Sequence, residues 1–180
     1  MRLYATDDMM AAHARRSSRE DCPLLHRFMA MDMDERWLNS SPETMLETFH
    51  WFQGEGFNFI IEDLLRIGPE RGIIVEGFRL LPHLVKPLIS ASSAVWLLPT
   101  SSFRQAVVES RGGSASSFLA RTSDPERALH NLLERDRMFT DILREETARL
   151  GLSSIDVDTT TTEDDLTKRV TDAFGLTSWK

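Results

Sequence analysis

The stretch Gly72-Ile73-Ile74-Val75-Glu76-Gly77 decides the fold class, because it is the strongest strand signal in the chain. Three consecutive β-branched residues stand between two glycines, and such a continuous apolar run is typical of a strand that is covered on both faces. Strands of this kind belong to parallel sheets that are flanked by helices. The stretch therefore predicts an α/β domain built on a mostly parallel sheet.

Further strands and helices are predicted on both sides of this stretch. One strand is expected before it and two after it, over residues 2–6, 94–98 and 154–157. Helices are expected over residues 9–16, 40–53, 57–67, 80–89, 103–110, 125–150 and 162–174. The second helix has capping-box spacing between Ser40 and Glu43, and the long one has Asp124 as a possible cap, Pro125 at its start and Gly151 at its end. Residues 17–40 have no clear period. Strands that alternate with helices predict one α/β domain over residues 1–180.

Composition narrows the class of protein. A chain of 180 residues with 41% apolar content suits one domain with its own core. The net charge of -7 argues against a general nucleic-acid-binding surface, and no apolar run is long enough to span a membrane. Cys22 is the single cysteine, and the first residues do not resemble a signal peptide, so a cytoplasmic location is expected.

Acidic residues follow the predicted strands at their carboxyl ends, where ligands bind in open parallel sheets. They are Asp7 and Asp8, Glu76, and Asp158. Glu76 suits a group that holds magnesium or orients an attacking oxygen, and the alternative is that it caps the strand or pairs with Arg79. Asp7 could accept the proton of a substrate hydroxyl, and the alternative, stronger for Asp8, is an N-cap. We expect the Asp7 and Glu76 carboxylates to approach each other.

Arginine is unusually frequent, with 18 residues against three lysines. A group of them surrounds the Gly/Ser-rich bend and the start of the long helix: Arg111, Arg121, Arg127, Arg135 and Arg137. Guanidinium groups can clamp a phosphoryl group, so residues 111–125 are a candidate lid with little apolar anchoring. The alternative is a solvated helix face with acidic partners. His13, Cys22 and His26 have too irregular a spacing for a zinc motif.

The order of these elements resembles the nucleoside and nucleotide kinase-like branch of the P-loop fold, over roughly residues 3–176. The resemblance rests on Tyr4-Ala5-Thr6-Asp7-Asp8, Ile73-Ile74-Val75-Glu76-Gly77-Phe78, Ala94-Val95-Trp96-Leu97-Leu98-Pro99-Thr100, Arg121-Thr122-Ser123-Asp124-Pro125-Glu126-Arg127 and Glu134-Arg135-Asp136. It implies phosphoryl transfer from ATP, with magnesium, to a small hydroxylated substrate such as a nucleoside, nucleotide, sugar or antibiotic. It also implies catalytic roles for Asp7 and Glu76, magnesium at Glu76, substrate binding by Asp8, His13 and Arg79, and ATP binding by Arg111, Arg121 and Arg135.

The phosphate-binding motif of that family, G-x-x-x-x-G-K-[ST], is absent from the 180 residues. No lysine follows a glycine, and the first glycine is Gly54. In the family this loop follows the first strand, which lies in the middle of the sheet. If the first strand of this chain corresponds to the second strand of the family, we expect a sheet that lacks its middle strand and has two unpaired edges. Either the domain is N-terminally incomplete and the loop is encoded upstream, or the chain is a non-catalytic relative that binds a small ligand or a protein partner.

Overall fold

The computed structural model describes residues 2–68, 72–90, 93–114 and 118–176. In chain order the elements are β1 (Arg2–Ala5), α1 (Met10–Arg16), α2 (Pro23–Ala30), α3 (Met33–Trp37), α4 (Pro42–Thr48), α5 (Phe57–Ile67), β2 (Ile73–Glu76), α6 (Pro82–Val85), the 3-10 helix η1 (Lys86–Leu88), β3 (Val95–Pro99), α7 (Ser101–Ser110), the 3-10 helix η3 (Phe118–Arg121), α8 (Pro125–Leu150), β4 (Ser153–Val157) and α9 (Glu163–Ala173). The protein is therefore a mixed α/β chain. No helix of the described residues is long and apolar enough to cross a membrane.

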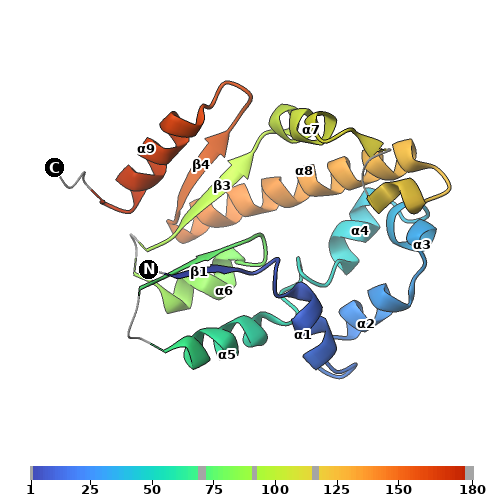
Figure 1. Cartoon of the computed structure of the whole chain (residues 1–180), viewed down its shortest axis with the longest axis horizontal. Helices are drawn as coiled ribbons and strands as arrows, with labels where there is room; N and C mark the ends of the chain where they lie inside the picture. The colour runs from blue at the N-terminus through green and yellow to red at the C-terminus, as the bar shows by residue number, and fades with distance from the viewer. Residues whose placement is uncertain (1, 69–71, 91–92, 115–117, 177–180) are drawn as a thin grey trace.

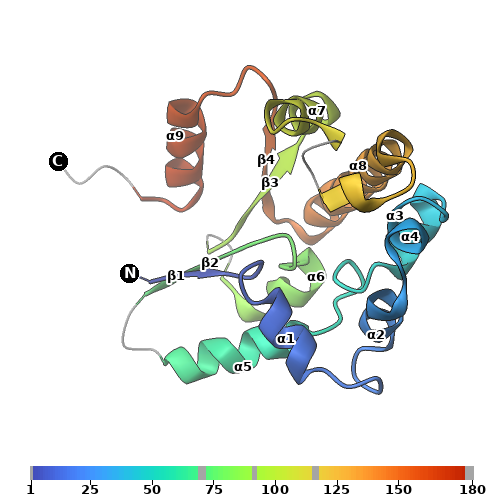
Figure 2. The ribbon, with the colours of Figure 1, turned by 45° about the vertical axis from the view of Figure 1, so that its right-hand side comes forward.

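The strands pair in parallel, as predicted, but they form two separate two-stranded sheets instead of one. In the first, β1 pairs with β2 so that Ala5 lies opposite Glu76; in the second, β3 pairs with β4 so that Pro99 lies opposite Val157. All four strands run in the same general direction, and β2 lies between β1 and β3 (Figures 1 and 2). The carboxyl ends of the strands consequently lie on one side of the molecule.

The prediction that both faces of residues 72–77 are covered is wrong. Ile74 is 51% exposed, and Leu3, opposite it on β1, is 63% exposed. Tyr4 is buried instead, and its hydroxyl donates to Asp63 of α5. Helices thus cover only one face of the β1–β2 sheet, because the apolar run of β2 specifies a strand but not the number of layers around it.

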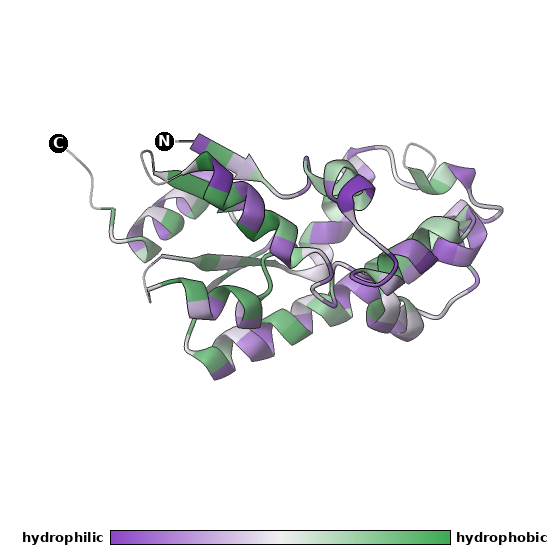
Figure 3. Ribbon diagram, turned by 90° about the horizontal axis from the view of Figure 1, so that it is seen from below, coloured by the Kyte–Doolittle hydropathy of each residue, from purple (hydrophilic) through white to green (hydrophobic). Residues whose placement is uncertain are grey.

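The helix α8 is the longest element, and its ends match the prediction. The Asp124 side chain accepts from the Arg127 backbone N–H, Pro125 occupies the first turn, and Gly151 ends the helix at a φ of 63°. Hydrophobic and hydrophilic segments alternate along its length (Figure 3). Its buried face packs on α3, α4 and η3 through Ala128, and near its C-terminus it packs on β3 and α6. The helix therefore connects the helical region to the β3–β4 sheet.

Two expectations about the first helices need correction. Residues 17–40 are not irregular, because they form α2 and α3. Pro23 begins α2, and a capping box between Asp32 and Glu35 begins α3. The cap of α4 is Ser41, whose side chain accepts from the Thr44 backbone N–H, and not Ser40. Pro42 favours the first helical position, so the residue directly before it becomes the cap.

Candidate functional site

The carboxyl ends of β1 and β2 meet, and the acidic residues predicted for this edge follow them. The Thr6 backbone N–H donates to the Glu76 carbonyl at 2.9 Å, directly after the last register pair of the sheet. A Cβ atom on Gly77 would lie 1.9 Å from Thr6 Oγ1 and 3.1 Å from Asp7 Oδ1. Only glycine fits at this position, and Asp7 reaches the residue next to Glu76 because of it.

The structural alternatives considered for these carboxylates are not realised in the described residues. The N-cap of α1 is Met9, and no side chain caps that helix, so neither Asp7 nor Asp8 has this role. Arg79 bonds elsewhere and forms no ion pair with Glu76. The side chains of Asp7, Asp8 and Glu76 are exposed. An exposed carboxylate beside a second strand end is available to a ligand.

Arg79 is buried, with 2% of its surface exposed, and it joins the strand ends to two helices. Its Nη1 donates to the Thr6 carbonyl at 3.4 Å and to His13 Nδ1 at 2.9 Å, and its Nη2 donates to the Gly56 carbonyl at 3.1 Å. The guanidinium also lies over the Trp51 ring at 3.9 Å from the centroid. Burial lowers the pKa of Arg79 to about 10, so the group stays charged at neutral pH.

His13 continues this network to α5. Because Arg79 can only donate, His13 Nδ1 accepts and the ring proton is on Nε2, which lies 2.7 Å from Asp63 Oδ2. Burial lowers the pKa of His13, and the Arg79 charge acts in the same direction. Burial alone would raise the pKa of Asp63, but hydrogen bonds from His13, Arg16 and Tyr4 outweigh it and lower this pKa to about 2. His13 and Arg79, both predicted to bind substrate, are thus brought together in a buried network.

The three arginines predicted to bind ATP lie in different surroundings. Arg111 follows α7 and Arg121 ends η3, and both are exposed. Arg135 is buried on α8, with 5% of its surface exposed. Its Nε and Nη2 donate to Asp136 Oδ1 at 3.0 and 2.6 Å, and its Nη1 has no hydrogen-bond partner in the part of the chain that the structure describes.

A cluster of aromatic rings surrounds Arg135, and we call it the aromatic cluster. Its members are Phe28, Trp37, Phe49, Phe52, Phe78 and Phe139. The Arg135 guanidinium carbon lies 4.6 Å from the Phe49 centroid, 5.0 Å from that of Phe52 and 5.2 Å from that of Trp37. The His50 ring lies 4.7 Å from Phe49 and 5.0 Å from Phe28. Burial lowers the pKa of His50 to about 3, so the ring is neutral, and its Nδ1 also has no hydrogen-bond partner among the described residues.

Sequence reasoning missed His50 and the aromatic cluster. The available signal was the high density of aromatic residues between residues 49 and 59, of which Phe49 and Phe52 have helical spacing. Phenylalanines at such positions are also common in ordinary cores. Only the convergence of α2, α3 and α8 on the loop around His50 distinguishes this group of rings.

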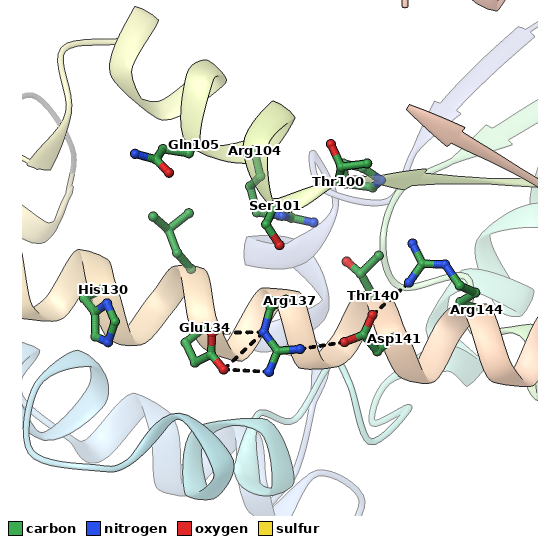
Figure 4. A pocket seen from close by; sticks show the side chains of 12 residues that line it. Thr100, Ser101, Arg104, Gln105, His130, Glu134, Arg137, Thr140, Asp141 and Arg144 are labelled. Atoms are coloured by element: carbon green, nitrogen blue, oxygen red, sulfur yellow. Dashed lines mark hydrogen bonds and ion pairs between the residues drawn. The ribbon is translucent and has the colours of Figure 1, made fainter. Parts of the chain in front are cut away.

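A second feature that the sequence did not indicate is a cavity of about 210 Å³ between α7 and α8, beside the carboxyl end of β3. Figure 4 shows Thr100, Arg104, Arg137 and Arg144 around it. Each arginine has an acidic partner: Arg104 pairs with Asp136, Arg137 with Glu134, and Arg144 with Asp141. The cavity is therefore polar and charge-balanced, and each arginine among its described lining residues is paired.

The remaining predicted positions are satisfied locally. In the candidate lid, residues 115–117 lie outside the described part, but Leu119 is fully buried and the Ser123 backbone N–H donates to Asp34 at 2.7 Å. The lid therefore has an apolar anchor that the glycines and serines did not predict. Asp158 accepts hydrogen bonds from Thr160 and Thr161 within its own turn. Among the described residues, no three His, Cys, Asp or Glu side chains converge on a metal site, and His26 bonds to Ser17.

Comparisons with protein-family models, with curated proteins and with solved structures found no match to this chain.

Proposed function

We propose that the chain is part of a P-loop kinase-like phosphotransferase, completed by a strand and a phosphate-binding loop from outside these 180 residues. The observation that carries the proposal is the strand pairing. The four strands form the parallel pairs β1–β2 and β3–β4, and β2 lies on the side of β3. If β1 corresponds to the second strand of the kinase-like fold, the pairs β1–β2 and β3–β4 would be the two halves of a sheet that lacks its middle strand.

Exposure of the strands supports the same proposal. Two-stranded sheets have marginal stability on their own, and parallel sheets normally have both faces covered. Here Leu3 and Ile74 are exposed on one face of the β1–β2 sheet, and Leu97 of β3 is 44% exposed. A further strand between β2 and β3 would pair two free edges, and the helix that follows it would cover apolar surface.

The acidic edge supplies the groups that phosphoryl transfer requires. As the acceptor oxygen attacks the γ-phosphorus, Asp7 takes the hydroxyl proton and ADP leaves. Glu76 has the hard oxygen ligands that magnesium prefers, and magnesium would neutralise charge on the phosphates. Asp8 lies beside Asp7 and would face the acceptor. His13 and Arg79 are buried, so they would position the strand ends without touching the acceptor. Arg111 and Arg121 are exposed, so their guanidinium groups are available to the phosphates of ATP.

Calorimetric titration with magnesium-ATP tests the proposal. Backbone N–H groups and the lysine of a phosphate-binding loop supply most of the favourable field around the phosphates. We therefore expect the 180-residue chain to bind no better than about 1 mM, and a form with a genomically encoded upstream loop to bind at least about a hundredfold more tightly, roughly 2.7 kcal/mol. Micromolar ATP binding by the 180-residue chain would overturn the proposal.

Glu76→Gln separates a catalytic from a structural role in the loop-containing form. The variant should lower turnover by about a hundredfold and leave the unfolding midpoint unchanged, because the exposed carboxylate would act mainly in the transition state. An unchanged rate would remove Glu76 from the mechanism.

The alternative function is that of a non-catalytic relative, which keeps the fold for binding a small ligand or a protein partner. The absence of G-x-x-x-x-G-K-[ST] favours this alternative. Translation of the genomic region upstream of Met1 distinguishes the two. An in-frame glycine-rich loop supports the kinase, and a stop codon directly upstream supports the relative.

A further inference from the structure

Arg135 Nη1 and His50 Nδ1 are the buried side-chain nitrogens that lack a hydrogen-bond partner within the described residues. Proteins pair nearly all buried polar groups, so each exception requires a physical explanation. Both nitrogens belong to side chains that contact the same ring, Phe49. Two unsatisfied groups at one cluster indicate a missing partner more strongly than either does alone.

The packing of the aromatic cluster points to the shape of that partner. The Phe52 and Phe139 rings lie 3.6 Å apart between centroids at an interplanar angle of 6°. Ring quadrupoles disfavour this face-to-face arrangement and favour an offset or an edge contact. Arg135 lies one helical turn before Phe139 on α8, and its guanidinium lies 5.0 Å from the Phe52 centroid. The disfavoured stack therefore stands next to the unpartnered donor.

We propose that the aromatic cluster binds a flat heteroaromatic ring between Phe52 and Phe139, with an acceptor atom on the ring edge taking the Arg135 Nη1–H. His50 Nδ1 completes the recognition of that edge. The assignment of this ring to the phosphoryl acceptor rests on the proposed function. With that assignment, the acceptor is a nucleoside-like molecule. The link is Phe78, a member of the cluster that follows Glu76 by two residues.

Charge and hydrogen bonding argue for a neutral ring. Asp136 already occupies two guanidinium nitrogens of Arg135 and offsets its charge, so one nitrogen remains for the ligand. A single donor and a neutral imidazole suit a carbonyl or ring nitrogen with a neighbouring N–H better than a phosphate, which needs several donors. Two apolar ring faces provide no partner for the hydroxyls of a sugar.

Space for the ring comes from movement of the loop that carries Phe52. The cavity lined by Phe28, Phe49 and Arg135 is about 20 Å³, which is enough for about one water molecule. Insertion must therefore separate Phe52 from Phe139 by about 3.5 Å, a carbon contact distance. Phe139 is fixed in the middle of α8, whereas Phe52 belongs to a series of turns between α4 and α5. Displacement of this loop would break turn hydrogen bonds, such as the one from the Phe52 backbone N–H to the Phe49 carbonyl, but none within α4, α5 or α8.

Titration calorimetry with the 180-residue chain, without ATP, tests the inference. The probes are the pyrimidine nucleosides uridine and cytidine, whose bases ATP does not contain, with ribose and inorganic phosphate as controls. At least one nucleoside should bind saturably with a dissociation constant below about 1 mM, and ribose and phosphate should not bind. Arg135→Met should weaken that binding at least about tenfold. The matched control is Arg137→Met on the same helix, where the side chain is 44% exposed and paired with Glu134; it should change affinity less than about twofold.

Failure of both nucleosides to bind, or equal losses in the two variants, overturns the inference. If Arg135→Met does not fold, histidine ring NMR of the unaltered chain replaces it. The His50 signals, assigned by their loss in His50→Gln, should shift when the nucleoside is added, and constant signals overturn the inference. These experiments contain no ATP and no upstream loop. A loop-containing form that gains no affinity for ATP would therefore overturn the proposed kinase activity and leave the ring-binding site to be judged by itself.

Discussion

Arg79 and Arg135 are both buried guanidinium groups that lie against aromatic rings, but their nitrogens are satisfied to different degrees. Arg79 donates to two backbone carbonyls and to His13, which connects it to Asp63. Among the described residues, Arg135 donates hydrogen bonds only to Asp136, the next residue in the chain, and one of its buried nitrogens has no partner. A buried charge is costly unless it is paired and hydrogen-bonded.

We interpret Arg79 as a structural arginine and Arg135 as the arginine of the proposed ligand-binding site. Arg79 holds the end of β1 to α1 and to the loop before α5, so its removal would leave several buried acceptors without a donor. Among the described residues, Arg135 forms no hydrogen bond to another segment of the chain. Its partner Asp136 also pairs with Arg104 of α7 and would keep that partner without Arg135. The Asp136 carboxylate and the aromatic rings around the guanidinium offset only part of the cost of burying this charge.

Replacement of Arg79 should have the largest effect. Arg79→Met removes the donor to Thr6, Gly56 and His13, and we expect a loss of about 3 to 5 kcal/mol in the free energy of unfolding. Urea denaturation followed by circular dichroism measures it. Arg66→Met is the control, because Arg66 lies exposed on α5. Similar unfolding midpoints for the two variants would contradict the structural role of Arg79.

A side chain at Gly77 should disturb the same network from the backbone. Gly77→Ala places Cβ 1.9 Å from the buried Thr6 hydroxyl at a φ of 130°, and we expect a loss of about 3 kcal/mol. Gly151→Ala is the control, because its φ of 63° imposes backbone strain in open space and should cost only about 1 kcal/mol. Equal losses in thermal unfolding would show that Thr6 yields to the new atom.

Acid should destabilise the fold through its buried histidines. The pKa of His50 falls from 6.5 unfolded to about 3 folded, so the unfolded chain binds more protons between these values. Stability is then lost as the pH falls below 6.5, with a slope of about 1.4 kcal/mol per pH unit from His50 alone. His13 acts in the same direction. Urea midpoints between pH 7 and 5 should fall less steeply for His50→Gln, and an unchanged slope would place the His50 ring in water.

Replacement of Arg135 should have the smallest effect on stability. Arg135→Met exchanges a partly satisfied buried charge for an apolar side chain among aromatic rings, and Asp136 keeps Arg104 as its partner. The free energy of unfolding should stay the same or rise by up to about 2 kcal/mol. Thermal unfolding of the variant beside Arg79→Met measures the contrast. A loss as large as that of Arg79→Met would mean that both arginines are structural.

Local patterns predicted much of the secondary structure and part of the candidate site. The β-branched run of β2 and the Asp124, Pro125 and Gly151 signals of α8 act within a few residues, so the sequence is sufficient for them. The strand-end positions of Asp7 and Glu76 followed from the same patterns. The helices α2 and α3 were missed because their Met-rich segment has no apolar period, although Pro23 and the Asp32 to Glu35 capping box mark their starts.

The parallel strands, the acidic residues at their ends and the absence of a phosphate-binding loop from these residues could be predicted from local patterns. The division of the strands into two sheets, the open face of β2 and the burial of particular arginines became visible only in the folded chain. The physical reason is the range of the interactions. Helix caps and strand runs depend on neighbours along the chain, whereas the Arg79 contact to His13 spans 66 residues. Whether a buried charge has a partner depends on such distant segments, and no local pattern encodes it.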